Sequence, residues 1–120
     1  QSAPSSSLQT AETAFNQKRY SEALTALNTY LVDNSEDTEA QLYKGISLLE
    51  LGQLEEAQSI FTTIVDGSST FSSEALWYSS LTYLKGGYET DCMFLLQQLI
   101  NSTQDQALAV KAERLLGKLQ

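Results

Sequence analysis

The sequence predicts an all-α chain in which helical hairpins repeat along 120 residues. The clearest hairpin lies in the stretch LYKGISLLELGQLEEAQSIFTTI, residues 42–64. Small and apolar residues recur there at helical spacing on both sides of Gly52. They are Leu42, Gly45, Leu48 and Leu49 before it, and Ala57, Ile60, Phe61 and Ile64 after it. Because glycine lacks a Cβ, Gly52 suits the left-handed turn that ends a helix.

The same pattern recurs with a period of 34 or 35 residues. Six classes of position keep this period: Leu8, Leu42 and Trp77; Ala11, Gly45 and Ser80; Lys18, Gly52 and Gly87; Ala23, Ala57 and Cys92; Leu27, Phe61 and Leu96; Tyr30, Ile64 and Leu99. One such class arises easily by chance, but several in phase do not. A period near 34 with two helices in each unit indicates stacked helical hairpins.

Over residues 5–101 the chain resembles the tetratricopeptide-repeat family. The resemblance rests on Ala11, Tyr20, Ala23, Leu27, Gly45, Gly52, Ala57, Phe61, Trp77, Tyr83, Gly87 and Leu96. It implies a right-handed α-solenoid of three hairpins with a C-terminal capping helix, about seven helices in all. The last helix would cover the apolar face that the third hairpin otherwise exposes.

The predicted elements follow from the polar breaks between periodic segments. We expect a flexible lead over residues 1–6, which is polar and holds the only proline, and a single domain over residues 7–120. The hairpins are predicted at residues 7–33, 37–65 and 73–100, and the capping helix at residues 104–119. Thr103 followed by Gln106 fits a capping box for that last helix.

Composition and charge exclude several partners. The net charge is −8, which argues against nucleic acid and against anionic membrane surfaces. It is compatible with a basic partner, although solubility alone also explains it. The sequence has no run of 18 apolar residues, so we expect no direct membrane insertion by this segment.

No set of residues predicts catalysis, a cofactor site or a metal site. Histidine is absent, and a single cysteine without histidine cannot form the usual zinc site. Cys92 takes the place of Ala23 and Ala57 in the repeat, so we expect it to pack as a small apolar residue. Its acidic neighbours Glu89 and Asp91 should raise the pKa of its thiol. The chain is therefore predicted not to be an enzyme.

The family resemblance implies a concave groove lined by the first helix of each hairpin. Carried over by position, the candidate groove residues are Glu12, Asn16, Glu39, Tyr43, Ile46, Glu50, Glu74, Tyr78, Leu81 and Lys85. Tyrosine and apolar side chains provide contact area, and the glutamates favour a partner with basic residues. Alternatively, Ile46 and Leu81 are packed in the core and the glutamates are only solvated. The positions that clamp a C-terminal carboxylate in chaperone-binding relatives hold no basic residue here.

The predicted function is protein–protein interaction, by an adaptor or scaffold module that binds a peptide or helix in the groove. The alternative is structural: a homodimer formed through Trp77, Tyr78 or the last helix, in the outer domain of a membrane-anchored bacterial protein. The stretch WYSSLTYLKGG resembles repeats of such proteins. Together with the richness in Ser, Thr and Gln, it favours a periplasmic or membrane-anchored location over a cytoplasmic one.

Overall fold

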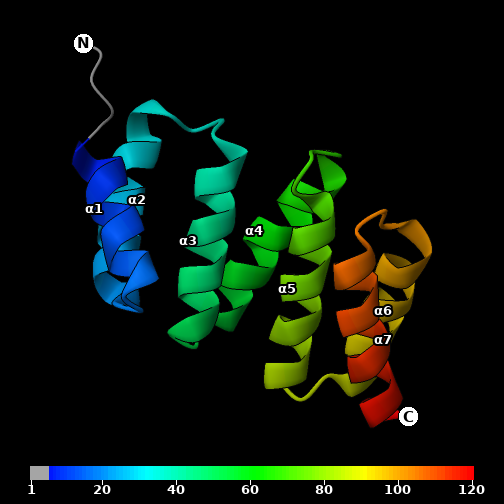
Figure 1. Ribbon diagram of the computed structural model, residues 1–120. Helices are drawn as coiled ribbons and strands as arrows, with labels where there is room; N and C mark the ends of the chain where they lie inside the picture. Colours follow the sequence, from blue (N-terminus) through cyan, green and yellow to red (C-terminus); the bar gives the residue numbers. More distant parts are fainter. Residues whose placement is uncertain (1–5) are drawn as a thin grey trace. The chain divides into compact units, whose positions relative to one another are not determined.

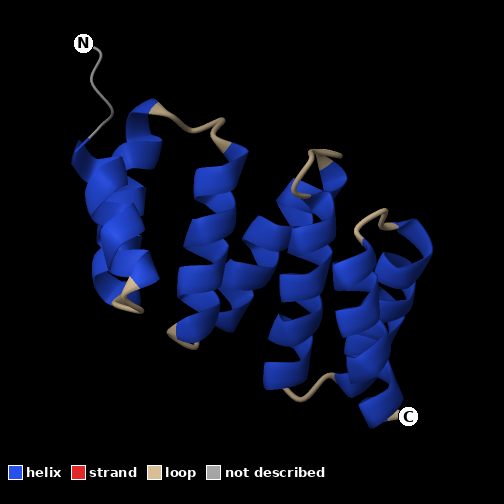
Figure 2. Cartoon of the chain, in the orientation of Figure 1, coloured by secondary structure: helices blue, strands red, loops and turns tan. Residues whose placement is uncertain are grey.

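The computed structural model describes residues 6–120, and within that range it contains seven α-helices and no strand (Figures 1 and 2). The helices are α1 (Ser6–Asn16), α2 (Tyr20–Asp33), α3 (Thr38–Glu50), α4 (Leu54–Asp66), α5 (Ser72–Lys85), α6 (Glu89–Ser102) and α7 (Gln106–Leu119). The predicted all-α class and the order of the helices are confirmed. Of the predicted lead, only Ser6 is described, and it begins α1.

The chain forms two compact units, the first ending at Ile60 and the second beginning at Phe61. In the first unit, α2 packs against both α1 and α3. In the second unit, α5, α6 and α7 pack against one another. Helix α4 contributes its first half to the first unit and its second half to the second. The single domain predicted for residues 7–120 stays a prediction.

The three hairpin turns share one backbone geometry. Lys18, Gly52 and Gly87 all have positive φ, at 61°, 81° and 89°. In each turn the next residue donates its N–H to the carbonyl five positions earlier: Arg19 to Ala14 at 2.8 Å, Gln53 to Leu48 at 2.8 Å and Tyr88 to Tyr83 at 2.9 Å. This bond satisfies a carbonyl that the helix end leaves without a partner. The predicted turn positions are therefore confirmed.

The small residues that recur in the sequence are fully buried. Ala23, Ala57 and Cys92 are each 0% exposed. The bulky members one turn later, Leu27, Phe61 and Leu96, are also fully buried. A small side chain lets the second helix of each hairpin approach its neighbours, and the bulky one fills the space beside it.

Helix α7 starts two residues later than predicted, and its N-cap is not Thr103. Asp105 is the N-cap, and its carboxylate accepts the N–H of Leu108 at 3.1 Å. The Thr103 hydroxyl instead accepts the N–H of Asp105 at 3.1 Å. Thr103 has ψ 146°, so the chain is extended there and cannot yet be helical.

Helix α7 completes the core of the second unit. Its buried residues Leu108, Ala112 and Leu116 join a cluster with Leu76, Cys92, Leu96 and Leu99. The Lys111 ammonium lies 4.8 Å from the centroid of the half-buried Trp77 ring. The predicted capping helix thus covers apolar side chains of α5 and α6, as a terminal element of a repeat stack does.

Candidate functional site

The predicted groove residues lie on α1, α3 and α5, and within each helix they share one face. On α3 the four candidates Glu39, Tyr43, Ile46 and Glu50 are separated by four, three and four residues. On α5 the candidates Glu74, Tyr78, Leu81 and Lys85 have the same separations, and on α1 Glu12 and Asn16 are four apart. Such spacing places side chains above one another along a helix.

The candidate residues differ in the exposed fraction of their side chains. Glu12, Asn16, Glu39, Glu50 and Lys85 are exposed, whereas Tyr43, Glu74, Tyr78 and Leu81 are half-buried. Ile46 is only 7% exposed and belongs to the buried core. Ile46 therefore has little surface to offer a partner.

Each candidate tyrosine packs against an aromatic ring of its own unit. The Tyr43 ring lies 4.7 Å from the ring of Phe15, measured between centroids, with the planes tilted by 53°. The Tyr78 ring stacks on Phe61 at 6.0 Å with the planes 24° apart. Both pairs have the separations favoured by aromatic side chains, so each phenol ring gains contact from a neighbouring ring.

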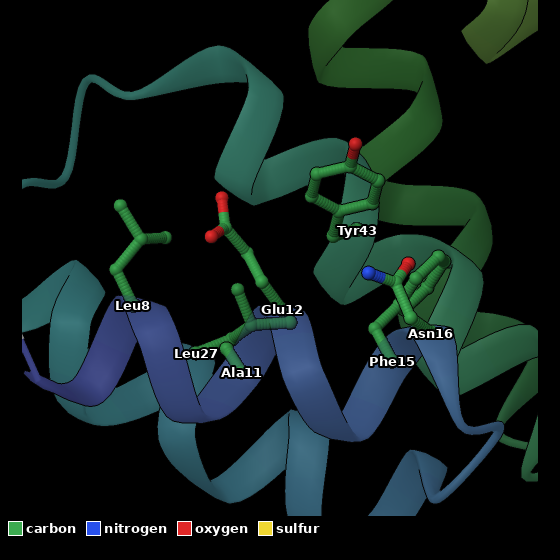
Figure 3. Close-up of a pocket in the computed structure, with 7 residues that line it drawn as sticks. All are labelled: Leu8, Ala11, Glu12, Phe15, Asn16, Leu27 and Tyr43. Atoms are coloured by element: carbon green, nitrogen blue, oxygen red, sulfur yellow. The ribbon is translucent and has the colours of Figure 1, made fainter.

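A pocket of about 140 Å³ opens between α1, α2 and α3 in the first unit (Figure 3). Leu8, Ala11, Glu12, Phe15, Asn16, Leu27 and Tyr43 line it. In Figure 3 the side chains of Leu8, Glu12 and Asn16 rise from α1, and the Glu12 carboxylate stands between Leu8 and the Tyr43 ring. The half-buried Leu8 and Phe15 give the pocket apolar surface, whereas Ala11 and Leu27, both 1% exposed, add little to it. Three of the predicted groove residues, Glu12, Asn16 and Tyr43, are thus brought together around one cavity.

Two polar side chains that line this pocket, Glu12 and Asn16, have no partner among the described residues. Within residues 6–120, the side chains of Glu12 and Asn16 form no hydrogen bond and no ion pair. None of the residues that line the pocket is basic. The pocket therefore combines an apolar floor with an unpaired carboxylate and an unpaired amide.

One further carboxylate, that of Asp37, acts on a tyrosine that Glu12 also affects. The Tyr30 hydroxyl donates a hydrogen bond to the Asp37 carboxylate at 2.6 Å, and Asp37 also caps α3 by accepting the N–H of Ala40 at 3.1 Å. The hydrogen bond to Asp37 is the main cause that raises the pKa of Tyr30, and the negative charge of Glu12 adds to it. Glu12 and Asp37 thus act on the same phenol, and the electrostatic environment beside the pocket is negative.

Four residues that line the pocket were not among the predicted groove residues. Leu8, Ala11, Phe15 and Leu27 appear in the sequence only as apolar or small positions of the helical pattern. Nothing in that pattern distinguishes a fully packed position from one that borders a hollow. The remaining candidates, Glu39, Glu50, Glu74, Leu81 and Lys85 among them, do not line this pocket.

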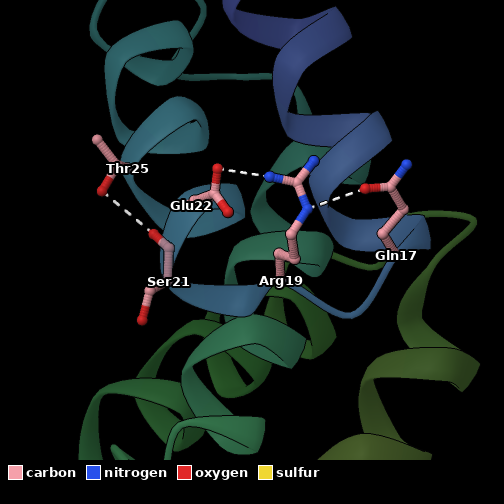
Figure 4. Close-up of polar contacts among 5 residues, drawn as sticks. All are labelled: Gln17, Arg19, Ser21, Glu22 and Thr25. Atoms are coloured by element: carbon pink, nitrogen blue, oxygen red, sulfur yellow. Dashed lines mark hydrogen bonds and ion pairs between the residues drawn. The ribbon is translucent and has the colours of Figure 1, made fainter.

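A second group of polar contacts surrounds the turn between α1 and α2 (Figure 4). The Arg19 guanidinium forms an ion pair with Glu22 and donates to the Gln17 side-chain oxygen at 2.9 Å, while the Thr25 hydroxyl donates to the Ser21 carbonyl at 3.2 Å. An open hollow nearby is lined by Ser6, Ser7, Thr10, Ser21, Glu22, Thr25 and Ala26. Because Arg19 and Glu22 are exposed, their pair adds little stability.

Cys92 lies in the core of the second unit, as its place in the repeat predicts. It is 0% exposed, and burial is the first cause that raises the pKa of its thiol, with Glu89 adding to the effect. A buried thiol with a raised pKa is a poor nucleophile. Within residues 6–120, no three His, Cys, Asp or Glu side chains are grouped so that they could hold a metal ion. In the same range, no helix has both the length and the apolar character that crossing a bilayer requires.

Comparison with known proteins agrees with the repeat pattern and the fold. The family model of the tetratricopeptide repeat matches residues 39–66, which cover α3 and α4. The fold is similar to the crystal structure of YrrB, described as a TPR protein with an unusual peptide-binding site, with a TM-score of 0.76 and 24% sequence identity. That match covers 87% of this chain and 53% of YrrB, so this chain spans about half of YrrB. No curated protein matches the sequence. Residues 39–66 thus match the tetratricopeptide repeat, and the chain has a fold similar to that of a tetratricopeptide-repeat protein.

Proposed function

We propose that this chain is a non-enzymatic protein–protein interaction module that binds a peptide segment of its partner on the face formed by α1 and α3. The observation that carries the proposal is the pocket lined by Glu12, Asn16 and Tyr43, where the unpaired side chains of Glu12 and Asn16 border apolar surface. Binding sites commonly combine apolar walls with a few polar groups that fix orientation. YrrB, which shares the fold, is described as having a peptide-binding site, and this supports the same class of ligand.

The size of the pocket favours a side chain over a whole small molecule. Pockets for drug-sized ligands and cofactors enclose about 300–1,000 Å³. The pocket here measures about 140 Å³, which is enough for one amino-acid side chain but not for a nucleotide or a similar cofactor. A peptide would therefore insert one residue here and lay its neighbours along the adjoining helix faces.

The remaining candidate residues extend the proposed surface within each unit. In the first unit, the exposed Glu39 and Glu50 flank Tyr43 along α3. In the second unit, α5 offers Glu74, Tyr78, Leu81 and Lys85 as its candidate surface. Most charged members of this set are acidic, so a partner with basic residues suits it. The proposed role in the cell is that of an adaptor or scaffold.

Peptide selection with mapping by NMR tests this proposal. Random peptides displayed on phage are selected on the chain, and the binders are titrated into ¹⁵N-labelled protein. We expect the largest shifts at the amides of Leu8, Glu12, Asn16 and Tyr43. Shifts centred on exposed apolar residues elsewhere, such as Phe94 or Tyr88, would contradict the proposed face. Light scattering tests the oligomeric state separately. A dimer that buries α1 and α3 would leave no surface there for a peptide.

A further inference from the structure

We propose that the pocket between α1, α2 and α3 receives one lysine or arginine side chain of the bound peptide. This inference rests on the proposed function and states which residue of the partner enters the pocket. A basic side chain has two parts, an apolar stem and a charged end. The pocket offers a matching surface to each part.

The floor of the pocket matches the stem. The half-buried Leu8 and Phe15 supply its accessible apolar surface, and the buried Ala11 and Leu27, both 1% exposed, complete the apolar lining behind them. The methylene groups of lysine and arginine pack readily on such surface while the charged end stays at the rim. A short polar side chain would not reach across this floor and would leave it uncovered.

The rim of the pocket matches the cation. The Glu12 carboxylate stands over the floor between Leu8 and Tyr43 (Figure 3), and no described residue pairs with it. Asn16, one turn along α1, brings an amide oxygen that can accept a further hydrogen bond. A carboxylate and an amide oxygen together can accept several of the donors that an ammonium or guanidinium group carries.

The chain itself supplies no cation to this rim. The basic residues of the first unit are Lys18, Arg19 and Lys44, and none of them lines the pocket. Arg19 pairs with Glu22 at the hairpin turn (Figure 4). Against these three basic residues the first unit has nine acidic ones, so its field attracts a basic peptide.

Other occupants fit the same pocket less well. An acidic side chain or a C-terminal carboxylate would be repelled by Glu12. A purely aliphatic side chain would cover the floor but would remove water from the Glu12 carboxylate without replacing its hydrogen bonds, which is costly. Only a side chain with an apolar stem and a cationic end satisfies both parts.

The first experiment changes the protein. Glu12→Gln removes the charge and keeps the shape, and Asn16→Lys places a competing ammonium four residues after Glu12, where the two side chains meet on α1. The matched controls are Glu55→Gln and Asn28→Lys, which make the same charge changes at exposed positions outside the pocket. We expect both pocket variants to weaken a selected peptide by about tenfold or more. Each control should change the affinity by less than about threefold, because neither residue lines the pocket and an exposed charge is screened by salt.

The second experiment changes the peptide. Each lysine of the selected peptide is replaced in turn by acetyl-lysine, and each arginine by citrulline, which keep the length and remove the charge. One replacement should reduce binding to the unchanged protein about tenfold or more and should have little effect in Glu12→Gln, because the two groups then no longer interact. Circular dichroism confirms that the variants are folded, as is expected for exposed positions.

The outcomes separate this inference from the proposed function. If peptides bind on the α1 and α3 face but carry no basic residue that couples to Glu12, the proposed function stands and this inference is wrong. If no peptide binds that face, both are wrong. Both the proposed function and this inference are supported if one basic residue of the peptide couples to Glu12. The same result requires that Asn16→Lys weakens peptide binding and that Asn28→Lys does not.

Discussion

Three equivalent positions show how differently the two units use one repeat pattern. Leu8, Glu12 and Asn16 on α1 correspond by the period to Trp77, Leu81 and Lys85 on α5. In the first unit these positions line a pocket with an unpaired carboxylate. In the second unit the Trp77 ring takes the place of Leu8, and the Lys111 ammonium of the same unit lies 4.8 Å from its centroid.

The charges of the two units follow the same contrast. The first unit has nine acidic and three basic residues, and the second has six and four. The second unit places one of its own cations on its aromatic surface, whereas the first leaves an anion exposed at a hollow. The two units thus share a repeat backbone, while one carries a contact between a cation and an aromatic ring and the other an unpaired carboxylate beside a pocket.

We expect the largest loss of stability when α7 is removed by ending the chain at Ser102. Leu108, Ala112 and Leu116 would be lost, and Leu96 and Leu99 would lose cover. Burial of each leucine stabilises by about 1.5–3 kcal/mol, so the second unit should lose several kcal/mol and its solubility should fall. Thermal unfolding followed by circular dichroism, together with light scattering, checks this. Unchanged stability and solubility would show that the second unit does not depend on α7.

Leu96→Ala and Leu27→Ala compare the two cores at equivalent buried positions. Leu96 is 0% exposed and Leu27 is 1% exposed, and large-to-small changes in a core cost about 2–5 kcal/mol. Leu27 already borders the pocket, so water can enter the space that its truncation creates. We therefore expect Leu96→Ala to have the larger effect in urea unfolding. A larger effect from Leu27→Ala would mean that the pocket does not soften the first unit.

Substitutions at the hairpin turns should change the stability less. The change should be a loss in the second unit and a gain in the first. Gly87 has φ 89° and open space where a Cβ would stand, so Gly87→Ala should cost about 1–2 kcal/mol from backbone strain alone. Lys18 occupies the equivalent place with φ 61°, so Lys18→Gly removes strain and should stabilise the first unit slightly. The control is Gly117→Ala inside α7, where alanine should add about 0.5–1 kcal/mol. The melting temperatures of the three variants test these expected changes in stability. A lower melting temperature for Lys18→Gly would contradict the expected relief of strain.

The smallest effect concerns the ionisation of Tyr30 in the first unit. The hydrogen bond to Asp37, with burial and the charges of Asp37 and Glu12, raises the pKa of Tyr30 above its ordinary value of 10.0. Because the folded pKa is the higher one, the stabilisation is complete below pH 10 and is lost as the pH rises through the folded pKa. Ultraviolet titration should show late ionisation from Tyr30, and Tyr30→Phe should remove that component. An unchanged titration in Tyr30→Phe would assign the late transition to another phenol.

Much of the fold could be predicted because the repeat pattern reports local requirements. Lys18, Gly52 and Gly87 mark the three hairpin turns, because at each of them a residue with positive φ ends the first helix of the hairpin. Ala23, Ala57 and Cys92 are buried because only small side chains fit where helices approach most closely. The start of α7 was missed because Thr103 and Asp105 can both cap a helix. The choice between them depends on the extended backbone at Thr103.

For the candidate site, the sequence by itself determined which residues share a helix face, and only the tertiary structure decided where a pocket opens. The spacing of Glu12 and Asn16, and of Glu39 and Tyr43, follows from helix geometry alone. The hollow depends on how side chains of three helices fill space together, with Leu27 from α2 below and Tyr43 from α3 against Phe15. The volume of such a pocket depends on how closely side chains from distant parts of the sequence pack against one another. A local sequence pattern does not contain that information.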